Sequence, residues 1–153
     1  MTTAEPTNPI RPSREAAIEA PRKRSTLNIV LWVVQVLLAL LFIWAGGMKL
    51  VLPLEKLAGP PGSVVLPGAF LRFIGVAELL GGLGLILPSL LRIRPGLTPL
   101  AAAGLVMIMI GAVGITFAGG GNVGMALIPG VTGLLAAFVA YGRWRLAPIR
   151  PKQ

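Results

Sequence analysis

Residues 27–50 read LNIVLWVVQVLLALLFIWAGGMKL, and this stretch decides the fold. It is predominantly apolar and carries no charged side chain before Lys49. A helix of this length, rising about 1.5 Å per residue, can cross roughly 30 Å of hydrocarbon. Three further apolar runs follow at residues 68–88, 99–117 and 123–141. The sequence therefore predicts an all-α integral membrane four-helix bundle whose spans run up-down-up-down.

The composition agrees with a membrane protein and excludes several other classes. Hydrophobic residues make up 55% of the 153-residue chain and charged residues only 12%, too apolar for a water-soluble domain of this size. Cysteine and histidine are absent, which removes disulfides, thiolate or imidazole metal sites and histidine-ligated haem. We therefore expect no metal site and no intrinsic cofactor. No nucleotide-binding loop or catalytic triad is present, so no catalytic residue is predicted.

The formal net charge of +9 comes from short basic clusters between long uncharged runs. Aromatic and basic residues are not interleaved as in nucleic-acid-binding proteins, so the expected partner is anionic lipid head groups rather than nucleic acid. Five basic residues precede the first span, two lie between the second and third, and four follow the last, leaving Lys49, Lys56 and Arg72 on the other side. Because basic residues collect on the cytoplasmic side, we predict that both termini are cytoplasmic.

The two ends of the chain are predicted to be tails. Residues 1–26 are polar, basic and rich in proline, so we expect a disordered basic cytoplasmic tail and no cleaved signal peptide. The four-helix domain is expected over residues 27–145. A short basic cytoplasmic tail is expected over residues 146–153.

The connections between the spans also carry signals. Thr98 followed by Pro99 predicts a capping residue and the first position of the third helix. Residues 119–122, three glycines and Asn122, predict a stop followed by a cap, so the last two helices should form a tight hairpin. Residues 51–67 contain four prolines yet are too apolar for a freely solvated loop, which predicts a short interfacial or re-entrant segment.

Helices in a membrane associate through close packing and polar contacts. Small residues at four-residue spacing, such as Ala77 with Gly81, predict close helix contacts, and Pro129 predicts a kink in the last span. The same spacing recurs at Gly114 with Ala118, Ala126 with Gly130, and Gly133 with Ala137. The uncharged polar side chains within the spans are interpreted as interhelical hydrogen-bond partners: Gln35, Thr116 and Thr132.

Glu78 is the leading candidate site residue, because it lies well inside the second span. A carboxylate roughly 10 to 12 Å below the outer end of a span costs at least about 2.5 kcal/mol unless it pairs, protonates or faces water. Lys49 is the expected direct partner, because Arg72 lies six positions before Glu78 and points to another face of the same helix. Arg72 is expected at the interface or on a ligand.

Two interpretations of these three charged residues stay open. In the functional one, they form a pocket at the outer mouth of the bundle that binds an acidic or quinone-like head group, or relays a proton. In the structural one, Lys49 and Glu78 form a buried ion pair that fixes how the first two spans dock. The structural interpretation is the simpler, because the spans contain a single acid.

Four segments resemble the DoxX-like membrane proteins: AGGMKL at 45–50, FLRFIGVAELLGGLGLILP at 70–88, LTPLAAAGLVMIMIGA at 97–112 and VAYGRWR at 139–145. The resemblance covers residues 27–145 and is most specific at Lys49 and from Arg72 to Glu78. It implies a compact four-helix bundle in the bacterial cytoplasmic (inner) membrane. Namesakes of the family are linked to membrane thiosulfate:quinone oxidoreductase complexes and to oxidative-stress assemblies, which makes quinone an expected ligand.

The sequence departs from this family at the end of the third span. Many relatives carry a histidine there, whereas this chain has Gly114-Ile115-Thr116-Phe117 followed by an uncharged loop. A role that depends on that histidine is therefore not expected here.

Three functional hypotheses follow from the residues and the resemblance. The first is an accessory or anchoring subunit of a membrane-bound, quinone-linked redox or stress-response assembly, with a membrane redox partner or a second copy of the chain. The second is a small transporter or permeability protein that uses Glu78 as its coupling acid. The third is an enzyme acting on a lipid-soluble substrate, with Lys49 and Glu78 as acid and base, so the question of catalysis stays open.

Overall fold

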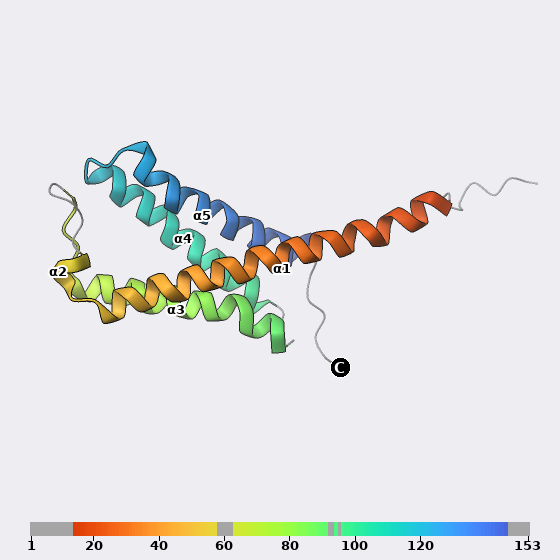
Figure 1. Cartoon of the computed structure of the whole chain (residues 1–153), viewed down its shortest axis with the longest axis horizontal. Coiled ribbons are helices and arrows are strands. Elements are labelled where there is room, and N and C mark those ends of the chain that lie inside the picture. The colour runs from red at the N-terminus through yellow and green to blue at the C-terminus, as the bar shows by residue number, and fades with distance from the viewer. Residues whose placement is uncertain (1–13, 58–62, 92–93, 95, 147–153) are drawn as a thin grey trace, which may run out of the picture.

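The computed structural model describes residues 14–57, 63–91, 94 and 96–146, with side chains described from Thr26 onward. Within those residues the chain forms helices and no strand. The helices are α1 (Arg14–Val51), α2 (Leu54–Leu57), α3 (Gly68–Leu91), α4 (Leu97–Ala118), α5 (Val123–Tyr141) and the π-helical η1 (Gly142–Leu146). Figure 1 shows α1 lying along α3 and α4 lying along α5.

Each of the four long helices contains a stretch long and apolar enough to cross a membrane. Successive spans run in opposite directions in Figure 1. One end of the bundle carries α2 and the turn between α4 and α5, and we call it the α2 end. The other end carries the connection from α3 to α4 and the end of α5, which continues into η1, and we call it the basic end. The predicted all-α four-helix membrane bundle is confirmed.

The first helix begins much earlier than predicted. α1 starts at Arg14, so the prediction of a disordered tail over residues 1–26 is wrong for its second half. Residues 14–20 (REAAIEA) are rich in strong helix formers, and the adjoining span supplies a nucleus onto which further helical turns add. α1 therefore extends past the rest of the bundle, as Figure 1 shows. The rest of the two predicted tails, residues 1–13 and 147–153, lies outside the described residues.

The turn between α4 and α5 forms as predicted. Gly119 ends α4, and Gly120 adopts a φ of 73°, a left-handed conformation that glycine accepts without strain. The side-chain oxygen of Asn122 accepts a hydrogen bond of 3.0 Å from the backbone N–H of Met125 and so caps α5. The tight hairpin of the last two spans is confirmed.

The start of α4 differs from the prediction that Thr98 caps it. The helix already begins at Leu97, and its first residue is preceded by Gly96, which provides no side-chain cap. Thr98 is fully buried, and its hydroxyl bonds to Ser89 of α3. A cap within α4 was predicted because the sequence shows the Thr98-Pro99 pair. The sequence does not show that the Ser89 hydroxyl of α3 lies within bonding distance of Thr98.

α3 and α5 each contain a proline beyond the first helical turn. α3 continues through Pro88 to Leu91, so this helix runs beyond the end predicted for the second span. α5 continues through Pro129, and the kink expected there stays a prediction. In the connection between α1 and α3, which is predicted to lie at the membrane interface, the described part contains the single turn α2.

The backbones of α1 and α3 approach each other at glycines. A Cβ atom on Gly46 would lie only 2.6 Å from the carbonyl oxygen of Gly75, and one on Gly82 would lie 3.0 Å from that of Ala39. Such contacts exclude larger residues, and they let two membrane helices pack closely. Around this seam lies the buried apolar core: Leu38, Ala39, Phe42, Leu85, Ala102, Leu105, Met109, Ala136 and Val139.

The small-residue contacts predicted from spacing are only partly present. A Cβ on Gly81 would collide with Leu105, and a Cβ on Gly133 would lie 3.0 Å from Met109, so both glycines face a neighbouring helix. Gly114 and Gly130 have open space at that position, so their predicted packing role is wrong. Four-residue spacing marks a helix face but does not say whether another helix covers it.

Candidate functional site

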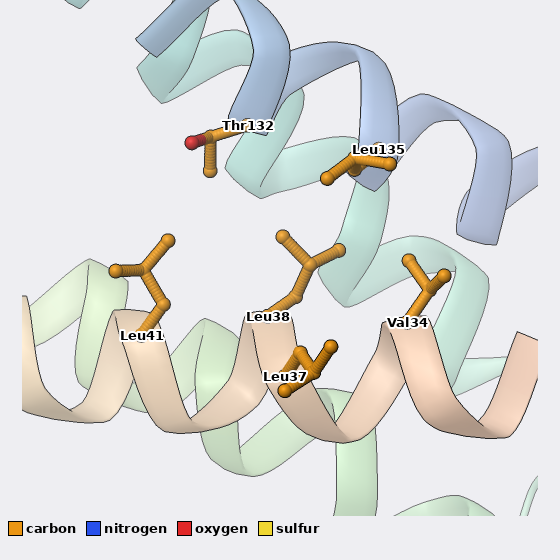
Figure 2. Close-up of a pocket in the computed structure, with 6 residues that line it drawn as sticks. All are labelled: Val34, Leu37, Leu38, Leu41, Thr132 and Leu135. Atoms are coloured by element: carbon orange, nitrogen blue, oxygen red, sulfur yellow. The ribbon is translucent and has the colours of Figure 1, made fainter. Parts of the chain in front are cut away.

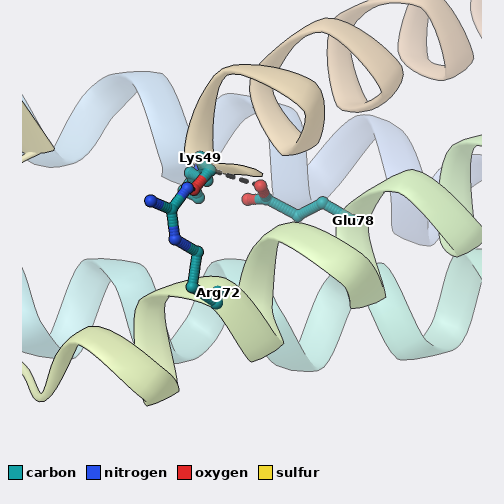
Figure 3. Close-up of polar contacts among 3 residues, drawn as sticks. All are labelled: Lys49, Arg72 and Glu78. Atoms are coloured by element: carbon teal, nitrogen blue, oxygen red, sulfur yellow. Dashed lines mark hydrogen bonds and ion pairs between the residues drawn. The ribbon is translucent and has the colours of Figure 1, made fainter. Parts of the chain in front are cut away.

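Lys49 and Glu78 meet at the α2 end, between α1 and α3 (Figure 3). The distance from Lys49 Nζ to Glu78 Oε2 is 2.7 Å. The Glu78 side chain is 4% exposed and that of Lys49 is 27% exposed, so the carboxylate is buried and the ammonium reaches it from the edge. The direct pairing predicted from the sequence is confirmed.

Glycines on both helices make this pairing possible. Gly75 lies one turn before Glu78 on α3, and a Cβ there would be 2.9 Å from the Cβ of Lys49. Gly46 lies one turn before Lys49 on α1, and a Cβ there would be 3.2 Å from the Cβ of Glu78. The charged side chains therefore extend from a point where the two backbones nearly touch.

Arg72 bonds to the end of α1. Its two terminal nitrogens donate hydrogen bonds to the backbone carbonyl oxygens of Lys49 and Leu52, the second over 2.9 Å. Carbonyls at a helix C-terminus lack partners within the helix and carry the negative end of its dipole, so a guanidinium satisfies and neutralises them. Arg72 therefore caps α1 from α3.

Lys49, Arg72 and Glu78, which we call the charged trio, join α1 to α3 at two points. Every hydrogen bond that the structure gives these three side chains ends on another protein group. A quinone head group needs hydrogen-bond donors for its carbonyl oxygens. Here one N–H group of Lys49 points at the Glu78 carboxylate and two N–H groups of Arg72 point at backbone carbonyls, so part of the donor capacity of the trio is committed to the protein.

A second polar cluster lies at the basic end and links all four spans. Gln35 of α1 donates through Nε2 to Leu85 O and to Ser89 Oγ, the latter over 2.9 Å. Ser89 Oγ and Thr98 Oγ1 are 2.8 Å apart, which joins α3 to α4. Arg143 Nε donates to Gln35 Oε1 over 2.8 Å, which adds η1. We call Gln35, Ser89, Thr98 and Arg143 the polar network.

Arg143 is the unusual member of the polar network. The residue is only 2% exposed, although the sequence places it among the basic residues that flank the last span. Its Nη1 donates to Asn28 Oδ1 over 2.7 Å, and its guanidinium carbon lies 5.2 Å from the centre of the Trp32 ring. Its Nη2 is buried and has no hydrogen-bond partner among the described residues.

Sequence reasoning found only one member of this network. Gln35 was predicted to bond between helices, and it does. Ser89 and Arg143 were missed, because each lies near a span end where polar residues are ordinarily solvated. The Gln35 amide in the middle of the first span was the available signal, since a buried amide needs partners on other helices.

The two threonines predicted as interhelical partners do not have that role. Thr116 Oγ1 donates to Ala112 O and Thr132 Oγ1 donates to Ile128 O, each over 2.8 Å and each within its own helix. A threonine hydroxyl in a helix readily reaches the carbonyl four residues earlier, so it needs no partner on another helix.

An apolar groove lies between α1 and α5 (Figure 2). It encloses about 130 Å³, and the residues that line it are Val34, Leu37, Leu38, Leu41, Thr132 and Leu135. The Thr132 hydroxyl is already bonded within α5, so the groove offers hydrocarbon contacts rather than a polar site.

The fold and its two polar clusters define a class: a small multi-pass membrane protein whose buried polar side chains bond one helix to another. The model of the DoxX-like family matches residues 33–140, well over half of the chain. The protein belongs to the DoxX-like family. No curated protein and no solved structure matches the chain.

Proposed function

We propose that this protein is an accessory subunit that anchors or positions a partner in a membrane-bound redox or stress-response assembly. In this proposal it resides in the bacterial cytoplasmic membrane, with the basic end and both termini in the cytoplasm. The observation that carries the proposal is the commitment of Glu78 to Lys49 at 2.7 Å in a buried position. A carboxylate paired in this way holds α1 against α3, is costly to unpair and is not free for chemistry.

The same observation weighs against the transporter and the enzyme. A coupling acid must load and release its cargo, and a general base must reach a substrate proton. Glu78 is 3% exposed and faces Lys49, and Arg72 is bonded to the end of α1. In this proposal any quinone of the assembly binds to the partner, because Lys49 and Glu78 are committed to each other.

The helix pair α4 and α5 is the surface that we assign to the partner. In the most apolar 18-residue stretches of α4 and α5, 17% and 22% of the residues are buried. The corresponding fraction is 33% in both α1 and α3. Large apolar side chains cover the pair, with Met107 70% and Ile128 74% exposed. A partner helix packed there would gain the close contacts that join membrane helices.

Site-specific photo-crosslinking in native membranes tests this proposal. A photoreactive residue at Met107 or Ile128 is expected to yield one discrete adduct with a second polypeptide. The matched control is Phe73 on α3, which is 66% exposed and lies outside the assigned surface. Adducts with lipid alone from all three positions would contradict an anchoring role.

A further inference from the structure

The basic end contains a buried cation that has no acidic partner among the residues whose side chains are described. Arg143 is 2% exposed, and its hydrogen bonds go to the neutral amide oxygens of Gln35 and Asn28. Among the residues whose side chains are described, the acids are Glu55 and Glu78, both at the α2 end. A charge buried without an opposite charge is costly, so an arginine in this position calls for an anion from outside the bundle.

The guanidinium has one edge that can still receive this anion. Nε is bonded to Gln35, and one face lies against the Trp32 ring, which leaves the edge formed by Nη1 and Nη2. Nη2 is unpartnered within the described part of the chain, and Nη1 is held only by Asn28, an exposed residue. If the Asn28 side chain turns away, both terminal nitrogens are available as the fork that binds phosphate or carboxylate oxygens in pairs.

The apolar groove and this edge lie along the same two segments of the chain, α1 and α5 with its extension η1. Val34 lines the groove and is followed directly by Gln35, the partner of Arg143. Leu135 lines its other wall, eight residues before Arg143, or about 12 Å along a helix. An acyl chain in the groove would thus place its head group near Arg143, at the end of the bundle where charge is best tolerated.

We propose that Arg143, opened by Asn28, binds the phosphate of an anionic phospholipid whose acyl chain lies in the groove between α1 and α5. The phosphate supplies the missing negative charge and accepts hydrogen bonds from Nη1 and Nη2. The lipid belongs to the leaflet at the basic end. This is one defined site, distinct from the general attraction of a basic protein to an anionic membrane.

Native mass spectrometry of the full chain in mild detergent tests the site. Phosphatidylglycerol is compared with phosphatidylcholine carrying the same acyl chains, and Arg143→Gln is compared with Arg145→Gln. Arg145 is the matched control, because it is an exposed arginine of η1 and its substitution changes the net charge equally. We expect wild type and Arg145→Gln to retain one phosphatidylglycerol preferentially, and Arg143→Gln to bind it about tenfold or more weakly.

Two further experiments complete the test. One distinguishes binding of the lipid from binding of free phosphate, and the other distinguishes a loss of lipid binding from a loss of folding. Inorganic phosphate is expected to leave the melting temperature unchanged, whereas phosphatidylglycerol raises it. Leu135→Trp, which fills the groove and keeps Arg143, is expected to weaken lipid retention, so the proposal stays testable if Arg143→Gln does not fold.

Three outcomes would overturn the proposal. One is equal retention of the two lipids by wild type. Another is an equal loss of phosphatidylglycerol in Arg145→Gln and Arg143→Gln, which would indicate surface electrostatics alone. The third is full stabilisation by inorganic phosphate, which would make the ligand a free anion.

Discussion

At the scale of single residues, the charged trio ties one buried acid into the contacts between α1 and α3. Glu78 accepts a hydrogen bond from Lys49, and Arg72 caps the helix that carries Lys49. Removing one member of a buried pair leaves an uncompensated charge, whereas removing both leaves none. Single and double substitutions therefore distinguish a structural ion pair from a functional site that needs the Glu78 carboxylate.

We predict that Glu78→Gln and Lys49→Met each lower the free energy of unfolding in detergent by about 2 kcal/mol or more. The double variant is expected to lose less than the sum of the two, because it leaves no charge unpaired. Lys56→Met, at an exposed position in α2, is the control and should change stability by less than about 0.5 kcal/mol. Thermal unfolding of wild type and of these four variants, with and without a short-chain quinone, gives the values.

The structural interpretation also predicts how the stability of these proteins responds to added quinone. None of the variants, nor wild type, should gain stability from the added quinone. A quinone-dependent shift in wild type that disappears in a folded Glu78→Gln variant would instead establish the charged trio as a binding site.

At the scale of helices, the seam between α1 and α3 depends on which glycine of a pair faces it. Gly46 and Gly47 are adjacent in sequence, yet a Cβ on Gly46 meets α3 backbone at 2.6 and 2.8 Å, while one on Gly47 meets nothing within 4 Å. Backbone atoms cannot move aside as a flexible side chain can, so overpacking at Gly46 forces the helices apart.

We predict that Gly46→Ala destabilises the protein by about 1 to 3 kcal/mol and weakens the Lys49–Glu78 pair. Gly47→Ala should be neutral or slightly stabilising, because alanine is the better helix former and has room. Unfolding in detergent gives both values. Equal effects of the two substitutions would show that α1 and α3 do not meet at Gly46.

How far the sequence predicts this structure depends on how local each signal is. Span lengths, the Gly119–Asn122 turn and the pairing of Lys49 with Glu78 follow from apolar runs, local caps and a single buried acid. The helical start at Arg14 and the burial of Arg143 were missed, because both depend on neighbouring structure. Thr116 and Thr132 were assigned the wrong partners, because spacing does not say whether a hydroxyl bonds within its own helix.

At the scale of the whole molecule, the turns at the two ends of the bundle should lie on opposite sides of the membrane. The chain has no cysteine, so one introduced thiol reports its own location. Val123 is exposed at the α4–α5 turn, and Gly96 is exposed at the start of α4 with nothing within 4 Å of its added Cβ.

We predict that an impermeant thiol reagent added to intact cells labels Val123→Cys and spares Gly96→Cys. After the membrane is permeabilised, both variants should be labelled. This result follows from a basic end that faces the cytoplasm. The reverse pattern in intact cells would place the basic end outside and refute the proposed orientation.

The proposed function requires that the charged trio stabilises a bundle whose task is to position a partner. The most direct measurement is the yield of the polypeptide adduct from a photo-crosslinker at Ile128, compared between wild type and the Glu78→Gln/Lys49→Met double variant in native membranes. We predict the same adduct in similar yield from both proteins, because the uncharged pair still folds. Loss of the adduct in a double variant that is folded and inserted would contradict the claim and assign Glu78 a direct role in function.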